Sequence, residues 1–219
     1  MKTIKNGLLV ILEGGEGVGK TTQAKKLVEY YQSKGFATKY FREPGGNKLA
    51  EDIRNMILYN EMDAMTETLL FTAARRINIT ENILPALKEG NIVILDRFVK
   101  STLVYQGVLK NGDMNFINTC IKEVASDIFN NEINSVEITL LCDPEVAMGR
   151  AAAEGHERNK FDVAPIEQYK KINDAYYDLY EKYDYCNCRV ICDADFTEEK
   201  VFNYLQFVID DIIYGHGED

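Results

Sequence analysis

Residues 14–21 read Gly-Gly-Glu-Gly-Val-Gly-Lys-Thr and match the pattern G-x-x-x-x-G-K-[ST], with its fixed positions filled by Gly14, Gly19, Lys20 and Thr21. The apolar stretch LLVIL precedes this loop at residues 8–12, and an amphipathic segment follows it. Glycines at this spacing let successive backbone N–H groups turn toward a phosphate, while the next helix points its positive end at it and the lysine adds a charge. A glycine-rich turn that contains Lys-Thr by chance is the alternative, and the strand-loop-helix context disfavours it. The stretch therefore predicts a phosphate-binding loop, or P-loop.

We expect the whole loop to bind ATP. The residues concerned are Gly14, Gly15, Glu16, Gly17, Val18, Gly19, Lys20, Thr21 and Thr22. The hydroxyl of Thr21 is expected to hold Mg²⁺, and Lys20 to neutralise charge on the transferred phosphoryl group.

Short apolar or β-branched stretches recur along the chain, with longer segments of helical spacing between them. They cover residues 7–12, 37–41, 91–95, 136–142 and 188–192. Buried strands that alternate with helices favour crossover units and a parallel sheet. The predicted fold class is therefore α/β, a P-loop NTPase-type five-stranded parallel sheet with helices on both faces and a short lid.

Two helices near the C-terminus are well marked. Residues 166–183 carry apolar and tyrosine side chains at helical spacing. Thr197 is a good N-cap for the last helix, with Glu198 and Glu199 in its first turn. The inner stripe of that helix is predicted to be Val201, Tyr204, Leu205, Val208 and Ile212.

We expect one domain over residues 1–219, because no repeat or low-complexity linker occurs and there are only four prolines. Residues 149–163 form the most polar connection between two helical stretches. A polar connection of this length is typical of a mobile lid.

The composition excludes several classes of protein. Of 219 residues, 46% are apolar and 27% charged, as in ordinary folded globular proteins. No apolar run approaches the ~20 residues that span a bilayer, so no membrane crossing is expected. The N-terminal MKTIKNGLLVILEGG runs straight into the glycine motif and is interpreted as a strand, not a signal peptide. With 25 Lys plus Arg against 35 Asp plus Glu, the net charge of −10 argues against a nucleic-acid partner.

The cysteine pattern does not indicate a metal. There are five cysteines and two histidines, without a pair of CxxC units, so zinc is not expected. Reduced thiols in a cytoplasmic protein are the favoured interpretation, and the cysteines receive no role.

The stretch NIVIL at residues 91–95 ends in Asp96-Arg97-Phe98. A carboxylate and a guanidinium then lie at the carboxyl edge of the sheet, where open α/β folds bind ligands. Asp96 is expected to orient Mg²⁺, and Arg97 to clamp a second phosphate. A solvent-facing salt bridge is the alternative.

A GTPase is a second possible P-loop class, because Asn159-Lys160-Phe161-Asp162 matches the N-K-x-D pattern that reads guanine. That motif should end a buried strand, but here it follows a polar stretch. No Asp in the chain has Gly three residues later, so the D-x-x-G motif is missing. The match is interpreted as chance.

From Leu8 to about Leu179 the sequence resembles the thymidylate kinase (dTMP kinase) family. Four blocks in order carry the resemblance: Leu12 to Gln23; Arg42-Glu43-Pro44-Gly45-Gly46 followed by Ile53-Arg54; Leu69-Leu70-Phe71 followed by Ala73-Ala74-Arg75-Arg76; and Asp96-Arg97-Phe98 with Ser101, Tyr105, Gln106 and Gly107. The resemblance implies transfer of the terminal phosphoryl group of ATP to dTMP, with Mg²⁺, by a cytoplasmic homodimer.

The resemblance also implies roles for single residues. Phe71 would stack on the thymine ring, and Arg75 and Gln106 would hydrogen-bond the base with Ser101 nearby. Arg54 and Arg97 would hold the monophosphate, with Glu43 beside the acceptor and Glu16 near the transferred group or its metal. Tyr105 and Tyr176 would lie by the sugar. The implied catalytic residues are Glu16, Lys20, Asp96, Arg97 and Arg158.

Two departures from the family pattern keep alternatives open. The lid has Ala152 and Glu154 where arginine is common, which leaves Arg158 as the expected donor, with Arg150 or Lys160 as alternatives. Ile77-Asn78 replaces a pair that often ends in histidine, next to the expected base pocket. A kinase of another deoxynucleoside monophosphate or of a nucleoside is therefore an alternative, and a nucleotide-binding module without catalysis is a third.

Overall fold

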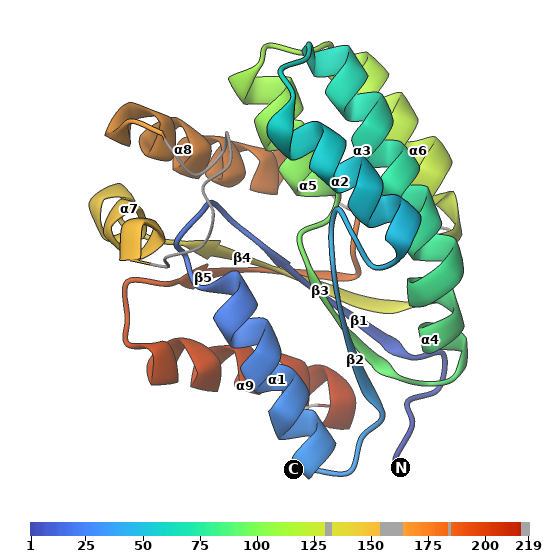
Figure 1. The fold of residues 1–219 in the computed structure, drawn as a ribbon. Coiled ribbons are helices and arrows are strands. Elements are labelled where there is room, and N and C mark those ends of the chain that lie inside the picture. Colours follow the sequence, from blue (N-terminus) through green and yellow to red (C-terminus); the bar gives the residue numbers. More distant parts are fainter. Residues whose placement is uncertain (130–132, 154–163, 184, 216–219) are drawn as a thin grey trace.

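The computed structural model describes residues 1–129, 133–153, 164–183 and 185–215. Its centre is one five-stranded sheet, in which all pairings are parallel and the strand order is β2-β3-β1-β4-β5 (Figure 1). The strands are β1 (Leu8–Glu13), β2 (Thr38–Arg42), β3 (Ile92–Asp96), β4 (Asn134–Leu141) and β5 (Cys188–Asp193). The predicted fold class and all five predicted strands are confirmed.

Helices cover both faces of this sheet. They are α1 (Lys20–Ser33), α2 (Lys48–Tyr59), α3 (Ala64–Asn78), α4 (Leu84–Lys88), α5 (Val99–Thr102), α6 (Met114–Phe129), α7 (Pro144–Ala153), α8 (Ile166–Lys182) and α9 (Glu198–Tyr214). Two π-helical segments, η1 (Ile79–Ile83) and η2 (Leu103–Leu109), continue α3 and α5. Figure 1 shows α1 and α9 together on one side, and α3 and α6 on the other.

The apolar run of β1 explains why both faces are covered. Successive side chains of a strand point to opposite faces. Leu9 and Ile11 therefore lie in the apolar cluster beneath α5, η2, α6 and α8, while Leu8, Val10 and Leu12 lie in the cluster beneath α1 and α9. All five side chains are buried. A strand buried on both faces needs an unbroken apolar sequence, which LLVIL provides.

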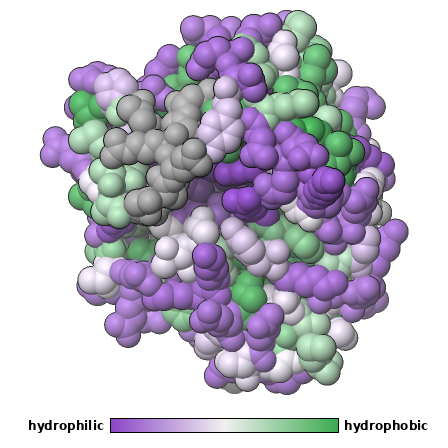
Figure 2. Space-filling view, viewed as in Figure 1, coloured by the Kyte–Doolittle hydropathy of each residue, from purple (hydrophilic) through white to green (hydrophobic). Residues whose placement is uncertain are grey.

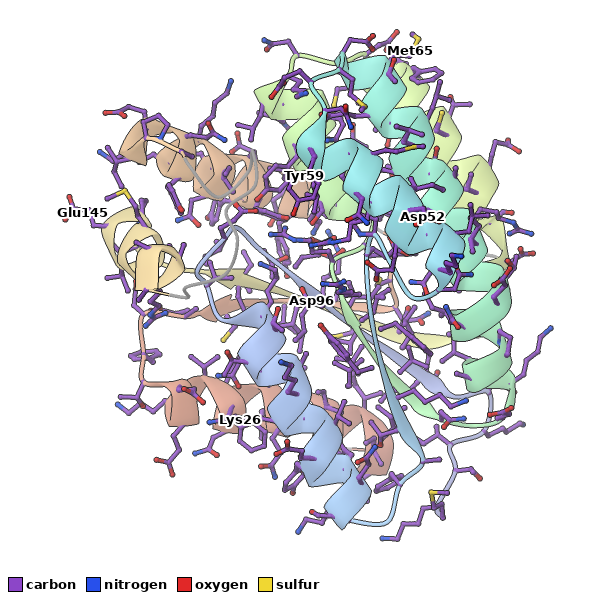
Figure 3. The ribbon with its side chains drawn as sticks, viewed as in Figure 1. Lys26, Asp52, Tyr59, Met65, Asp96 and Glu145 are labelled. Carbon is purple, nitrogen blue, oxygen red and sulfur yellow. The ribbon has the colours of Figure 1, made fainter. Side chains whose placement is uncertain are left out.

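The register of β1 and β3 brings the two sequence motifs together. Leu12 pairs with Asp96, so the P-loop after β1 and the Asp96-Arg97 pair after β3 leave the sheet at the same edge. Asp96 lies at the centre of the molecule, between α1 and α2 (Figure 3). This edge is where open parallel sheets bind ligands.

The C-terminal helices agree with the predicted boundaries, with two errors in the inner stripe of the last helix. Thr197 caps α9 and accepts a hydrogen bond from the amide of Lys200. The buried stripe of α9 is Val201, Leu205 and Ile209. Tyr204 was predicted to face inward but is 39% exposed, because it lies on the side of Val201 that faces away from Leu205 and Ile209. Ile209, which was not predicted, is fully buried.

The single-domain and lid predictions are only partly covered by the structure. Residues 149–153 end α7, and residues 154–163 lie outside the described part of the chain. Within the described ranges, no helix combines the length and apolar character needed to cross a bilayer.

Candidate active site

The P-loop wraps the start of α1. Lys20 is buried at the first position of this helix, and its ammonium group donates a 2.5 Å hydrogen bond to the carbonyl oxygen of Gly15. Burial and the neighbouring Arg97 lower the pKa of Lys20 to about 8. Gly17 has a φ of 72°, and a β-carbon there would lie 2.0 Å from the carbonyl oxygen of Ala147 in α7. Only glycine therefore lets α7 pack against the loop.

The hydroxyl of Thr21 and the carboxylate of Asp96 meet beside the loop. The Thr21 hydroxyl donates to Oδ2 of Asp96 at 2.6 Å, and the Tyr40 hydroxyl donates to the same oxygen at 3.3 Å. Mg²⁺ prefers hard oxygen ligands and commonly takes one or two from protein, completing its shell with water and phosphate. The Thr21–Asp96 pair has this chemistry. In the described part of the chain no cluster of three or more His, Cys, Asp or Glu side chains could hold a metal ion.

Arg97 lies in the middle of the site in a strained backbone conformation, with φ at +70°. Its guanidinium donates to the carbonyl oxygen of Gly14 and to Glu16 Oε1, each at 2.9 Å, and to the Ser101 hydroxyl at 3.2 Å. Glu16 also accepts a 2.5 Å hydrogen bond from the Tyr105 hydroxyl. Burial lowers the pKa of Arg97, but Tyr105 and Glu16 outweigh it and raise that pKa well above its usual value. Arg97 is therefore a permanently charged anion ligand that the P-loop itself holds in place.

Glu13 supports this arrangement and was missed in the sequence. It is fully buried at the end of β1. Its Oε1 accepts from the amides of Phe98 and Ser101 at 2.9 and 3.1 Å, and its Oε2 accepts from the Ser101 hydroxyl at 2.7 Å. The carboxylate thus caps the start of α5 and fixes the turn that carries Arg97. The sequence did offer a signal for Glu13, because it is an acidic residue between an unbroken apolar strand and a glycine-rich loop.

A cavity of about 680 Å³ opens above the P-loop, toward α2, α3 and η2. Its wall contains five cationic side chains (Lys20, Arg42, Arg54, Arg75 and Arg97) and four acidic ones (Glu16, Glu43, Glu51 and Asp96). In a protein of net charge −10, this local excess of cations marks an anion site. Hydrophilic residues gather in the middle of this face of the molecule (Figure 2).

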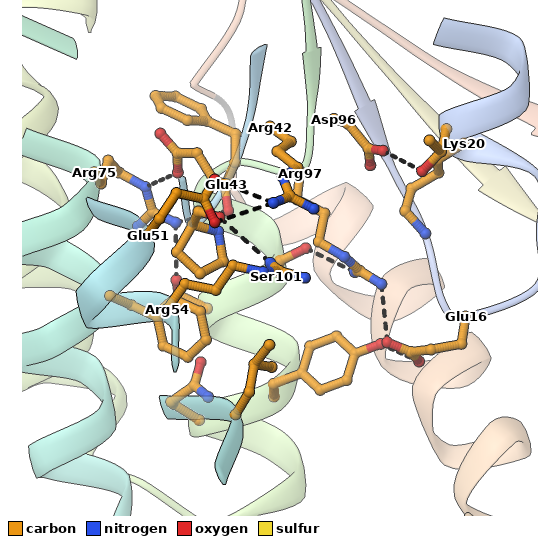
Figure 4. Close-up of a pocket in the computed structure, with 18 of the residues that line it drawn as sticks. Glu16, Lys20, Arg42, Glu43, Glu51, Arg54, Arg75, Asp96, Arg97 and Ser101 are labelled. Atoms are coloured by element: carbon orange, nitrogen blue, oxygen red, sulfur yellow. Dashed lines mark hydrogen bonds and ion pairs between the residues drawn. The ribbon is translucent and has the colours of Figure 1, made fainter. Parts of the chain in front are cut away.

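Arg42, Arg54 and Arg97 lie close together in the middle of the site, whereas Arg75 lies to one side (Figure 4). Burial and the neighbouring Arg42 lower the pKa of Arg54, with a further contribution from Arg97. Arg42 pairs with Glu51 at 3.0 Å, whereas the guanidinium of Arg54 donates to the carbonyl oxygen of Pro44 at 3.3 Å. Like charges held this close repel one another until an anion joins them. The cluster is suited to a phosphate dianion.

A second, less exposed end of the cavity lies between α3 and η2. Arg75 is buried there, and its Nε donates to Glu43 at 2.6 Å. Its Nη2 donates to the carbonyl oxygen of Phe98 and the hydroxyl of Thr102, at 2.9 and 3.0 Å. Its Nη1 is buried and has no hydrogen-bond partner among the described residues. A buried donor of this kind is costly unless a ligand completes it.

Most of the predicted site residues border this one cavity. They are Glu16, Gly17, Gly19, Lys20, Thr21, Thr22, Glu43, Arg54, Phe71, Arg75, Asp96, Arg97, Ser101, Tyr105 and Gln106. Gly14, Gly15 and Val18 belong to the loop but are not part of the cavity wall. Tyr176 is fully buried outside the wall, where its hydroxyl lies 2.9 Å from that of Ser101 and 3.4 Å from Arg97. Its predicted contact with a sugar stays a prediction.

The lid arginines remain largely outside what the structure describes, because Arg158 and Lys160 fall in residues 154–163. Arg150, in α7, donates a 2.8 Å hydrogen bond to the carbonyl oxygen of Ala194. The guanidinium of Arg150 is therefore already engaged by the segment that follows β5.

The departure at Ile77 and Asn78 does not reach the cavity, since neither residue is part of its wall. The Asn78 amide donates to Glu43 at 3.5 Å and accepts a 3.0 Å hydrogen bond from Asn82. Asn78 therefore lies behind Glu43.

A P-loop on the central strand, an oxygen pair for a metal and an arginine cluster facing one cavity define a P-loop enzyme of phosphoryl transfer. The family model described as thymidylate kinase matches residues 12–203. The thymidylate kinases of Bacillus mycoides, Bacillus cereus and Bacillus anthracis are each 35% identical over 209 residues, which is 94% of this chain and 98% of theirs. The chain belongs to the thymidylate kinase family, and the predicted family is confirmed. It is a kinase, a transferase of phosphoryl groups.

Proposed function

We propose that this chain transfers the terminal phosphoryl group of ATP to the 5′-phosphate of dTMP, giving dTDP and ADP. The observation that carries the proposal is the continuous cavity that runs from the P-loop to Arg75, Phe71 and Gln106, between α3 and η2. One end suits the phosphates of a donor nucleotide, and the other offers a hydrogen-bond donor to an exocyclic oxygen of a base. Family membership supports both assignments.

At the donor end, the residues of the P-loop bind the phosphates of ATP through their backbone amides, and Lys20 contacts the transferred group. Thr21 and Asp96 would hold Mg²⁺, which neutralises phosphate charge when bound. When ATP is bound, a neighbouring phosphate favours the charged form of Lys20 and raises its lowered pKa.

At the acceptor end, Arg97 and Arg54 bind the monophosphate and aim one of its oxygens at the donor. No general base is required, because a phosphate monoester is already ionised near neutral pH. Catalysis then consists of alignment and charge neutralisation. Glu16, which Arg97 and Tyr105 hold at the junction, keeps the guanidinium in position until the phosphates arrive.

The base lies between α3 and η2 in this proposal. Phe71 stacks on the ring, and Arg75 donates to an exocyclic oxygen while Glu43 fixes its guanidinium. Tyr105, which borders the cavity, crowds the place of a ribose 2′-hydroxyl. Because Ile77 and Asn78 lie outside the cavity wall, they give no support to an altered base preference.

Several further features belong to the same proposal. Arg158 supplies a lid charge to the transferred group. The enzyme works as a homodimer, which the exposed apolar side chains of Leu49 and Met56 on α2 and Met65 and Leu69 on α3 support. A cytoplasmic location agrees with five cysteines that form no disulfide.

The test is a coupled assay of ADP release with ATP, Mg²⁺ and a panel of acceptors: dTMP, dUMP, dCMP, dGMP, UMP and thymidine. We expect dTMP to give the highest kcat/KM. Preference for another acceptor would require a new assignment of the base pocket, and ATP binding without any turnover would leave a nucleotide-binding module.

A further inference from the structure

Glu67, on α3, is a buried carboxylate that the proposed reaction does not use. Its side chain is fully inaccessible to solvent. It accepts a 2.8 Å hydrogen bond from the amide nitrogen of Gln106 and a 2.6 Å hydrogen bond from the ammonium group of Lys110. Lys110 also donates to the carbonyl oxygen of Met62 at 2.9 Å. Glu67, Phe71 and Arg75 follow one another at four-residue spacing, so they lie on the same side of α3.

This contact fixes which way the amide of Gln106 points. An ionised carboxylate can only accept hydrogen bonds, so the nitrogen of Gln106 must face Glu67. Turning the amide over would place its oxygen against the carboxylate, with no hydrogen between them. Gln106 borders the cavity, so it offers a base its carbonyl oxygen and its second N–H, side by side in a set order.

That order matches one class of pyrimidine. Thymine and uracil carry a donor at N3 next to a carbonyl oxygen, which complements an acceptor beside a donor. Cytosine carries an acceptor at N3 next to an amino group, which requires the opposite amide orientation. A mismatch would leave buried polar groups unpaired, and such groups give strong discrimination.

We propose that Glu67 is a positioning residue that locks the Gln106 amide and thereby selects a 2,4-dioxopyrimidine nucleotide over a cytosine nucleotide. The inference rests on the proposed function and names the residue that sets its base specificity. Lys110 determines which atom of residue 67 faces Gln106, because its ammonium group holds one oxygen of residue 67 toward itself.

The substitution Glu67→Gln tests the lock by changing one atom. The new amide keeps its oxygen toward the Lys110 ammonium group and turns its nitrogen toward Gln106. Two nitrogens then face each other, and the Gln106 amide must turn over. We expect the ratio of kcat/KM for dTMP to that for dCMP to fall by about 10- to 100-fold, the effect of one or two mispaired buried groups. The change should lie in the acceptor KM, with the KM for ATP unchanged.

Matched variants separate this effect from general damage. Lys110→Arg keeps a cation beside the buried carboxylate, so Glu67 stays an acceptor for Gln106 and the variant should keep the wild-type ratio. The double variant Glu67→Leu/Lys110→Met replaces the ion pair by apolar groups, a change that buried pairs often tolerate, and frees the amide to take either orientation. In this double variant the ratio of kcat/KM for dTMP to that for dCMP should lie between the ratios of the wild type and of Glu67→Gln. The double variant replaces Glu67→Gln as the test if Glu67→Gln fails to fold. Glu89→Gln makes the same chemical change at an exposed glutamate that pairs with Lys39, and should have no effect.

The ratio of dTMP to dUMP is the internal control, since both bases present the same hydrogen-bonding edge. It should be constant in every variant that alters the ratio to dCMP. If Glu67→Gln or the double variant lowers the rates with dTMP and dCMP by the same factor, Glu67 is only structural and the inference is wrong. If the wild-type chain does not prefer dTMP, the proposed function fails, and the inference fails with it.

Discussion

Replacement of Arg97 by alanine is the sharpest test of the proposed acceptor site. In the free protein this guanidinium makes hydrogen bonds to Gly14, Glu16 and Ser101 at 2.9 to 3.2 Å, and its side chain is 21% exposed. It is thus a partly buried, pre-positioned cation. We expect Arg97→Ala to abolish most transfer to the monophosphate while ATP binding stays nearly intact.

The magnitude follows from the charge pair that the variant lacks. Truncating one partner of a buried, hydrogen-bonded charge pair raises the free energy of the complex by about 2–5 kcal/mol. At 1.36 kcal/mol per factor of ten, kcat/KM for dTMP should fall by about 30- to 5,000-fold. Two effects of the substitution on the affinity for ATP oppose each other. Loss of Arg97 removes a cause of the lowered pKa of Lys20, but it leaves Glu16 without its cation beside the phosphates. We expect the Kd for ATP to change by less than about 3-fold.

The assay is coupled ADP release for kcat/KM, together with calorimetry for ATP binding and thermal unfolding to verify the fold. The double variant Arg97→Ala/Glu16→Gln removes the uncompensated carboxylate and should restore any loss of ATP affinity without restoring transfer. Arg76→Ala is the matched control, because Arg76 is an exposed arginine paired with Asp127 and such pairs contribute little. An equal loss of ATP binding and of transfer in Arg97→Ala would refute the assignment.

The remaining predictions concern the lid, the P-loop lysine and the base pocket. Arg158→Ala should lower kcat far more than ATP affinity in steady-state kinetics, and an unchanged kcat would transfer the role to Arg150. Because the pKa of Lys20 is lowered to about 8 and a bound phosphate raises it, ATP binding at pH 8 should take up about half a proton at this group, and almost none at pH 6.5. Calorimetry in buffers of different ionisation enthalpy measures this uptake, and a pH-independent value would contradict the lowered pKa. Arg75→Met leaves Glu43 buried without its cation and should lower the free energy of unfolding by about 3–5 kcal/mol in urea titrations. Arg75→Met/Glu43→Gln should recover at least half of that loss, and no recovery would mean that the pair is not coupled.

The sheet could be predicted closely because its strands are buried on both faces. A segment such as 92–95 must then be apolar at every position, and the pattern survives without any knowledge of its partners. The meeting of the P-loop and Asp96 was predictable for a related reason. Parallel strands have their carboxyl ends at one edge, so residues far apart in the chain are brought together by topology alone.

The supporting carboxylates were not predictable in the same way. Glu13 binds the amide of Ser101 across 88 positions of sequence, and Glu67 binds Gln106 across 39. Hydrogen bonds of this range depend on side-chain direction, which no periodic pattern encodes. The π-helical segment η2 was missed as well. One extra residue per turn there determines which side chains of 103–109 face the cavity, and local composition does not specify it.

The departure at Ile77 and Asn78 shows how the structure changes the weight of a sequence difference. In the sequence, Ile77 and Asn78 lie two and three residues after Arg75, which suggests an altered base pocket. In the structure Asn78 approaches Glu43, on the side away from the cavity wall, and a neutral amide there leaves the negative charge of Glu43 to Arg75. A cationic partner at position 78 would instead compete for that carboxylate and weaken its hold on the guanidinium. The departure therefore bears on how firmly Arg75 is held, and not on a direct contact between residue 77 or 78 and the base.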